Sequence, residues 1–332
     1  MDAVLKKDRL DELITKLGYE VIAPVRKGTT VSFETVSKAS DIAWDYANSV
    51  VPPKKIFFPQ TEELFAFDGK TIAERTPETI KRMVLGIRPC DARSFAILDP
   101  LFTKDFKDPY YIRRRENTVL VGLACAIPGR NCFCTSLGAG PFDTTGLDLL
   151  LVDMGDRFLV RSVTEKGKTL LTENEELFEE ATDEAGTADE IRERAESAIK
   201  RTVDVSGLPE KLKTLFDHPV WEDMAQTCLG CYNCTYLCPT CHCFDIQDEV
   251  RGRKGRRIRV WDSCSNPEYT LHGSGYNPRP GRKNRMRNRI LHKYQYYPDN
   301  FGVIACVGCG RCASNCPVGL SIVEELSTLG GI

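Results

Sequence analysis

One spacing of cysteines occurs twice in this sequence, and it limits the possible folds more than any other feature. Each run follows C-x2-C-x2-C-x3-C-P, the spacing that ligates [4Fe–4S] clusters. Three closely spaced thiolates let one loop bind three irons of a cubane, and the final proline turns the chain away. Glycines at 230, 308 and 310 are expected to permit unusual backbone dihedrals there. The runs comprise Cys228, Cys231, Cys234, Cys238 and Pro239, and Cys306, Cys309, Cys312, Cys316 and Pro317.

The two runs are expected to exchange ligands. In proteins with two clusters, the fourth cysteine of each run ligates the other cluster. One cluster is therefore assigned to Cys228, Cys231, Cys234 and Cys316, and the second to Cys306, Cys309, Cys312 and Cys238. The long spacer between the runs favours an α-helical ferredoxin arrangement over the compact β-rich one. Zinc is the alternative metal, but zinc sites usually pair two C-x2-C units without the third cysteine and the proline.

The overall composition is that of a globular metalloprotein. The chain has 332 residues with 42% hydrophobic and 28% charged content, and no apolar stretch approaches the ~18 residues of a membrane span. Its 15 cysteines are odd in number, and the charged N-terminus lacks an apolar signal segment. These features argue against a disulfide scaffold and predict a cytoplasmic protein. The net charge of −2 excludes a generally basic protein that coats nucleic acid.

The hydrophobic pattern predicts an α/β N-terminal domain followed by a mostly α-helical ferredoxin domain with two clusters. Uniformly apolar stretches of this kind are typical of strands that are buried on both faces of an α/β sheet. The expected domains are residues 1–165, an acidic helical connector at 166–208, and the ferredoxin-like domain at 209–332. The expected N-terminal elements are a helix at 8–17, a hairpin at 19–24 and 30–35, and strands at 83–87, 119–123, 149–153 and 157–163.

The connector carries an unusual run of charge. Between Glu173 and Glu190 there are nine acidic residues and no basic one. We interpret the stretch from 164 to 203 as a helix that faces solvent and bends near Gly186. A docking surface is the alternative interpretation.

Four cysteines of the N-terminal half are expected to meet. Cys90 and Cys125 each follow a predicted strand, and open α/β sheets place their sites at the carboxyl ends of parallel strands. Cys132 and Cys134 come just after Cys125 in a glycine-containing loop. Together these four thiols form a candidate third cluster site. A zinc site and buried inert cysteines are the alternatives.

Three further cysteines stay unassigned: Cys241, Cys243 and Cys264. They could ligate another metal with His242 or His272, or Cys241 and Cys243 could replace a ligand assigned above. The favoured interpretation is that they pack beside the clusters.

Two basic stretches flank these residues. Residues 251–259 and 279–289 each contain six Arg or Lys. A solvated surface and a nucleic-acid site are two interpretations, but no recognised nucleic-acid motif accompanies them. Cations near an anionic cluster raise its reduction potential. We therefore expect these residues to tune a cluster or contact an acidic partner subunit, without nucleic acid.

Several catalytic fingerprints are missing from the sequence. There is no G-x-G-x-x-G after a strand, no P-loop, no H-E-x-x-H and no G-x-S-x-G. The chain is therefore expected to have no flavin or NAD site of its own. Clusters without a visible substrate site indicate an electron carrier rather than a free-standing enzyme, and no catalytic residue is assigned.

With these motifs the sequence resembles a known family, the iron–sulfur beta subunit of cytoplasmic NiFe sulfhydrogenases and the related iron–sulfur subunit of anaerobic sulfite reductase. The resemblance implies an electron-transfer subunit between a flavoprotein that binds NAD(P) and a catalytic redox subunit. That catalytic partner would be a hydrogenase, a sulfite reductase or a heterodisulfide-reductase-type module. The motifs are the second cysteine run together with Pro52–Lys55, Pro59–Glu62, Arg88–Asp91, Asn131–Ser136, Cys238–Asp245 and Trp261–Cys264.

The function expected from the sequence is therefore single-electron relay within a multisubunit oxidoreductase. The alternative is a redox enzyme in its own right, which reduces a small sulfur compound at the N-terminal cysteine site.

Overall fold

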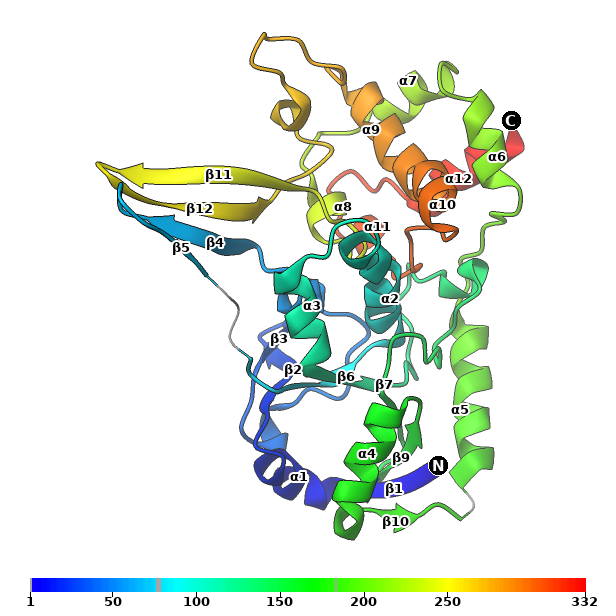
Figure 1. The fold of residues 1–332 in the computed structure, drawn as a ribbon. Coiled ribbons are helices and arrows are strands. Elements are labelled where there is room, and N and C mark those ends of the chain that lie inside the picture. The colour runs from blue at the N-terminus through cyan, green and yellow to red at the C-terminus, as the bar shows by residue number, and fades with distance from the viewer. Residues whose placement is uncertain (1, 76–78, 183) are drawn as a thin grey trace.

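A mixed eight-stranded sheet forms the base of the N-terminal half (Figure 1). The computed structural model describes residues 2–75, 79–182 and 184–332. The strand order is β10-β1-β9-β8-β7-β6-β2-β3, and the four neighbours β8, β7, β6 and β2 run parallel. The strands are β1 (Asp2–Lys6), β2 (Glu20–Lys27), β3 (Thr30–Thr35), β6 (Arg82–Ile87), β7 (Thr118–Leu123), β8 (Leu149–Asp153), β9 (Arg157–Ser162) and β10 (Glu179–Glu180).

The apolar stretches fold as the sequence predicts. The strands expected at 83–87, 119–123, 149–153 and 157–163 are β6, β7, β8 and β9, and every residue of β7 is buried. The hairpin is also confirmed, because β2 pairs with β3 in antiparallel fashion around Gly28 at φ +60°. The helix expected at 8–17 is α1 (Leu10–Lys16), which follows a 3-10 turn, η1 (Lys7–Arg9).

Helices lie against this sheet. They are α2 (Pro89–Thr103), α3 (Pro109–Glu116), α4 (Glu165–Glu173) and α5 (Glu184–Ala198). The acidic stretch was expected to be one helix bent near Gly186, and this expectation is wrong. Gly186 lies inside α5, and a short 3-10 turn, η5 (Glu175–Leu177), and strand β10 separate α5 from α4. Leu170 and Ile191 join the core of the sheet, so the two helices bury one face each and expose their acidic faces. The stretch also includes residue 183, which lies outside the described residues.

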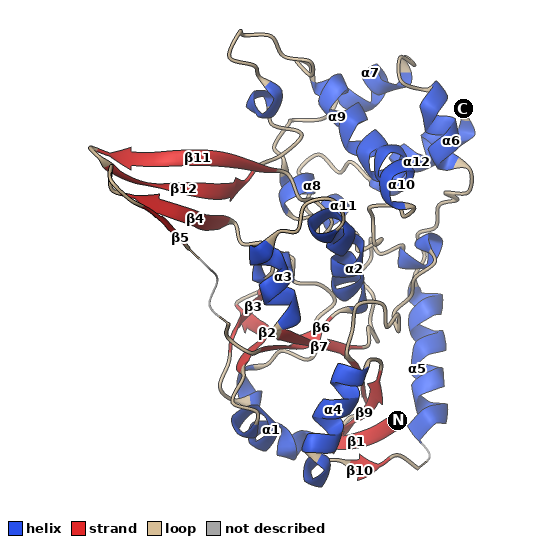
Figure 2. Ribbon diagram, in the orientation of Figure 1, coloured by secondary structure: helices blue, strands red, loops and turns tan. Residues whose placement is uncertain are grey.

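A second sheet projects from the body and forms what we call the wing (Figure 2). Its antiparallel order is β11-β12-β4-β5. The strands are β4 (Thr61–Phe67), β5 (Ile72–Glu74), β11 (Phe244–Arg251) and β12 (Lys254–Trp261). The basic stretch at 251–259, expected to be helix or loop, therefore belongs to a long hairpin. Every residue of β11 is exposed, so no buried face produces a period-two hydrophobic pattern.

Ion pairs hold the wing and neutralise its basic residues. Arg259 is buried and contacts the carboxylates of Glu62 and Asp108. Further out, Arg257 pairs with Asp248 at 2.7 Å. The arginines of this first basic stretch are thus largely matched by acidic side chains of the wing and its base.

Helices and loops build the rest of the C-terminal part. They are α6 (Leu208–Thr214), α7 (Val220–Ala225), α8 (Asn233–Tyr236), α9 (Arg282–Leu291), a π-helical turn η7 (His292–Tyr296), α10 (Tyr297–Phe301), α11 (Arg311–Ser314) and α12 (Ile322–Gly331). The remaining 3-10 turns are η2 (Ala39–Asp41), η3 (Pro53–Ile56), η4 (Cys134–Leu137) and η6 (Pro267–Thr270). Trp221, Leu212, Ile290 and Leu326 share a core that is separate from that of the large sheet. The part is helical around this core, but the wing hairpin limits the description "mostly α-helical". Among the described residues, no helix is long and apolar enough to span a bilayer. The expected division of the chain at 165 and 208 stays a prediction.

The second cysteine run lies directly against the N-terminal half. Arg311 inserts between the halves and pairs with Asp91 through two contacts of 2.7 Å, and both side chains are buried. The Phe133 backbone N–H donates to the Gly308 carbonyl at 2.8 Å, and the Asn48 amide donates to the Cys309 carbonyl at 2.9 Å. Side chains and backbone therefore join loops that are far apart in the sequence.

Two glycines allow this close approach. A Cβ on Gly308 would lie 2.5 Å from the Cys134 backbone nitrogen, and a Cβ on Gly310 would lie 2.4 Å from the Asn131 carbonyl oxygen. Both glycines also have positive φ angles, +65° and +72°. Neither backbone nor neighbour can accept a larger residue here.

We expect Gly310→Ala to destabilise the protein more than Gly302→Ala. Both glycines have φ +72°, so both substitutions introduce the left-handed strain of about 1–2 kcal/mol. Only the alanine at 310 also collides with backbone, since nothing lies within 4 Å of a Cβ at 302. The difference between the two variants' denaturation midpoints measures the close contact alone. Equal midpoints would show that the two loops do not meet as described.

Candidate iron–sulfur centre

The sequence repeat is also a repeat of backbone shape. Gly230 and Gly308 have φ angles of +69° and +65°, and Tyr232 and Gly310 have +65° and +72°. Short helices α8 and α11 then begin at equivalent positions. Tyr232 is the described non-glycine residue with positive φ, so the first run adopts the loop shape despite local strain. The expected unusual dihedrals at these glycines are confirmed.

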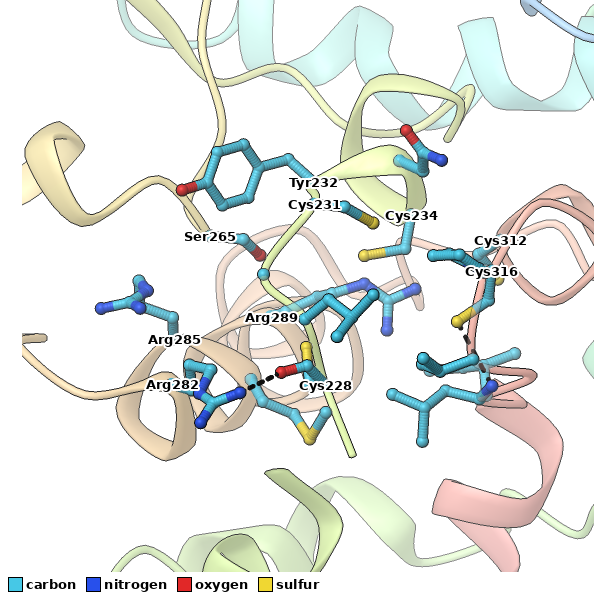
Figure 3. A pocket seen from close by; sticks show the side chains of 18 of the residues that line it. Cys228, Cys231, Tyr232, Cys234, Ser265, Arg282, Arg285, Arg289, Cys312 and Cys316 are labelled. Atoms are coloured by element: carbon cyan, nitrogen blue, oxygen red, sulfur yellow. Dashed lines mark hydrogen bonds between the residues drawn. The ribbon is translucent and has the colours of Figure 1, made fainter. Parts of the chain in front are cut away.

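The four cysteines assigned to the first cluster line one cavity. Figure 3 shows Cys228, Cys231, Cys234 and Cys316 around a common space, with Cys312 at its edge. The Leu320 backbone N–H donates to Cys316 Sγ at 3.3 Å, a contact of the kind that orients a cluster ligand. Cys231 is exposed, so this cavity reaches the surface. The structure thus brings the fourth cysteine of the second run to the first triplet.

The second basic stretch surrounds this first cavity. Arg282, Arg285 and Arg289 line it, and Arg282 donates to the Cys228 carbonyl oxygen at 2.6 Å. Arg289 is buried, and although burial opposes this, the charges of Cys234 and Cys312 raise its pKa. The expectation that cations lie near a cluster therefore fits residues 279–289, whereas residues 251–259 lie in the wing.

Cys238 lies beside the second run. Lys293 of the π-helical turn donates to Cys238 Sγ at 3.3 Å and to the Ala305 carbonyl at 3.1 Å, next to Cys306. Thr240 donates to the same carbonyl at 2.7 Å. The charge of Cys238 also contributes, after burial, to the raised pKa of Cys312. These contacts bring the fourth cysteine of the first run to the second triplet.

Two buried polar atoms beside these cysteines lack a partner in the described part of the chain. They are the hydroxyl of Tyr294 and Nε of Arg289. Tyr294 lies near Cys306, whose charge adds to burial in raising the tyrosine pKa, and Arg289 lies between Cys234 and Cys312. Unsatisfied buried donors are rare in proteins and indicate an additional acceptor. Inorganic sulfides or cysteine thiolates of a cluster would provide such acceptors, so the residues fit the group.

The four N-terminal cysteines also meet in one cavity. Cys90, Cys125, Cys132 and Cys134 line it together with Cys309 of the second run. Cys90 lies in the first turn of α2 and Cys125 follows β7, so parallel strands deliver both thiols to one sheet edge as expected. Burial raises the pKa of Cys132 and Cys134, to about 12 and about 11. Thiols held neutral in this way would need a metal to ionise them.

The remaining three cysteines fall into two places. Cys241 contacts Cys238, and Cys243 contacts Cys264 at the base of the wing. The His242 ring lies 5.3 Å from that of His292, whereas the His272 ring contacts Tyr276 in an exposed loop. Within the described residues, no group of three or more His, Cys, Asp or Glu side chains is arranged to hold a single metal ion.

Sequence reasoning missed several residues that surround the cysteines. Lys54 is buried and donates to the Cys241 carbonyl at 2.7 Å, and Asn48 reaches Cys309. Lys293, Tyr294 and Arg311 are also buried. Lys54 lies in one of the motifs that carry the family resemblance, which was the available signal. An isolated lysine or tyrosine has no spacing from which its neighbours can be inferred.

Comparison with known proteins agrees with the geometry. The family model for a 4Fe-4S dicluster domain matches residues 227–320. The chain is 36% identical over 308 residues to sulfhydrogenase 2 subunit beta of Pyrococcus furiosus, which covers 92% of this chain and 91% of the relative. No solved structure matches. The chain belongs to the iron–sulfur family of sulfhydrogenase beta subunits, as its cysteine runs and the motifs around them indicate.

Proposed function

We propose that this electron-transfer subunit relays single electrons through three [4Fe–4S] sites in a row. Cys228, Cys231, Cys234 and Cys316 would hold the first cluster, Cys306, Cys309, Cys312 and Cys238 the second, and Cys90, Cys125, Cys132 and Cys134 the third. When bound, each cluster supplies a reversible one-electron carrier.

One observation carries the order of the three sites. The second run lies between the other two groups, since Cys312 lines the first cavity and Cys309 lines the N-terminal cavity. Cys132 Sγ lies 3.7 Å from the Cys309 carbonyl oxygen, so protein atoms of neighbouring sites are in contact. A row of sites that share their walls suits stepwise electron transfer.

Both ends of this row approach the surface. At the first cavity, Cys231 is exposed, and Leu229 and Val318 beside it are 63% and 40% exposed. Near the N-terminal cavity, Ile127 is 77% exposed and follows Cys125 closely. Exposed apolar side chains next to a redox site are typical of docking surfaces. One end would meet a flavoprotein subunit that binds NAD(P), and the other a catalytic redox subunit.

Buried cations would favour the reduced clusters. Arg289 lies by the first two sites, Lys293 by the second, and Arg311 between the second and third. Each cation partly offsets the negative charge that a cluster with four thiolates gains on reduction. Of these, Lys293 makes the most direct contact with a proposed ligand sulfur.

We expect the chain, purified without oxygen, to contain about 12 iron atoms, at four per cubane. Cys234→Ser and Cys132→Ser should each lower this number by about four, because one ligand of one cluster is lost in each. Iron and sulfide analysis with electron paramagnetic resonance of the reduced protein makes the measurement. About eight irons, unchanged in Cys132→Ser, would remove the third site, and bound zinc without iron would contradict the whole proposal.

Lys293→Met is expected to lower the reduction potential of the second cluster. The variant removes a buried positive charge that donates to Cys238 Sγ, and a charge-assisted contact of this kind corresponds to a shift on the order of 50–100 mV. Methionine keeps the length of the side chain, and Thr240 still donates to the Ala305 carbonyl. A spectroscopic redox titration measures the shift.

The control for this titration is Lys200→Met, which removes an exposed charge outside the cysteine sites. Its potentials should equal those of the unmodified chain. An unchanged potential in Lys293→Met with full iron content would show that Cys238 is not a ligand of this cluster.

A further inference from the structure

A cavity of about 1000 Å³ opens at the base of the wing, away from the three cluster sites. Phe102, Tyr110 and Phe244 form an apolar wall, and Cys243 and Cys264 lie on the side facing the helices. The volume is that of sites that bind small molecules. The proposed relay uses neither this space nor these two cysteines.

The hairpin holds the two thiols together. Cys243 immediately precedes β11 and Cys264 follows β12, and the Asp262 backbone N–H donates to the Cys243 carbonyl at 3.0 Å. The Cys264 thiol donates a hydrogen bond to Cys243 Sγ, and so do the Cys264 backbone N–H and the Tyr269 hydroxyl. These donors lower the pKa of Cys243 to about 6, while contact with Cys243, together with burial, raises that of Cys264. One sulfur is therefore a thiolate and its neighbour a thiol, the pairing that thiol–disulfide exchange requires.

The pair lies close to the second cluster site. The charges of Cys241, Cys238 and Cys243 all act on the buried ammonium of Lys54. That ammonium donates to the Cys241 carbonyl at 2.7 Å and lies 4.2 Å from the centre of the Trp261 ring. One side chain thus spans the region between Cys238, a proposed cluster ligand, and the dithiol.

The cavity also has a cation suited to an anionic ligand. Arg279 lines it, is half-buried, and forms no ion pair within the part of the chain that the structure describes. Its charge contributes, after burial and Lys293, to the lowered pKa of His292, about 4. His292 and His242 are consequently neutral near pH 7, and Arg259 is already paired with Glu62 and Asp108. The positive charge of Arg279 remains available.

We propose that Cys243 and Cys264 form a redox-active dithiol that reduces small anionic compounds with an S–S bond in this cavity. The inference rests on the proposed function, because electrons from the second cluster site would regenerate the dithiol. It adds a two-electron reaction to a chain whose other sites transfer one electron at a time.

The reaction consists of two successive thiol–disulfide exchanges. The Cys243 thiolate attacks one sulfur of the bound R–S–S–R′, forming a mixed disulfide and releasing R′–S⁻. The Cys264 sulfur, after losing its proton to the released thiolate, attacks Cys243 Sγ and releases R–S⁻, leaving a Cys243–Cys264 disulfide. Two electrons, delivered singly, and two protons then restore the two cysteines. The net reaction converts the S–S compound, two electrons and two protons into two thiols.

Disulfide mapping of the full, iron-loaded chain tests the pair. After anaerobic treatment with oxidised glutathione and alkylation in denaturant, Cys243 and Cys264 should be recovered linked to each other, with Cys241 alkylated. In Cys264→Ser the second step is blocked, so glutathione should remain attached to Cys243. In Cys243→Ser, Cys264 should carry at least tenfold less glutathione, since its thiol is held neutral. Both variants should keep the iron content of the unmodified chain.

Several results would overturn the proposal. Cys243 and Cys264 that stay alkylatable after oxidation would exclude a redox pair, and a loss of about four irons in either variant would make them cluster ligands instead. Failure of the relay gives a different pattern, in which the chain lacks iron but still forms the disulfide. Mixing the pre-reduced chain with oxidised glutathione tests the link. Cluster absorbance should recover at least tenfold more slowly in Cys243→Ser, and equal rates would refute electron transfer through the pair.

Charge recognition has its own control. Arg279→Met should slow oxidation of the dithiol by anionic oxidised glutathione by about tenfold, the value of one charge-assisted hydrogen bond. Oxidation by neutral hydroxyethyl disulfide should not change. Equal slowing with both reagents would indicate a distorted cavity and contradict anion binding by Arg279.

Discussion

The buried pair between Arg311 and Asp91 is the contact on which the arrangement of all the cysteine groups depends. Arg311 lies within the second run, and Asp91 follows Cys90 at the start of α2. Removing one partner of such a pair typically costs about 3–5 kcal/mol, because the other charge is left buried and unpaired. The pair therefore fixes the second run against the sheet. From that position the run contributes one cysteine wall to each neighbouring cavity.

A surplus of buried positive charge points to what the cavities contain. Lys54, Lys293 and Arg289 are each at most 7% exposed, and of these only Arg289 has a nearby carboxylate, Glu325 at 3.6 Å, within the described part of the chain. Burying an ammonium without a counter-charge costs several kcal/mol. The cysteine sulfurs around them provide that counter-charge only when ionised, and metal binding is what ionises a buried thiol. The cations and the metal sites are thus two parts of one electrostatic arrangement.

The parts of the structure that follow local rules were predictable from the sequence. Strand β7 is apolar throughout, and ligand spacing within each run reflects a single loop around a cubane. The meeting of Cys90 and Cys125 followed from the geometry of parallel strands. The wing was not predictable in this way, because β11 is exposed on both faces and β12 pairs with the distant β4. Its arginines appeared as a free basic patch until their acidic partners were known.

The same hairpin explains why the dithiol is independent of the metal sites. Eight residue pairs, from Phe244 opposite Trp261 to Arg251 opposite Lys254, fix the register of β11 and β12. Because this ladder is made of backbone hydrogen bonds, it places Cys243 near Cys264 whether or not iron is present. The cysteine runs differ, since their thiols surround cavities with buried donors that lack partners in the described part of the chain. Removing iron should therefore disorganise the runs while leaving the thiol pair in contact, so the two redox devices can be separated by experiment.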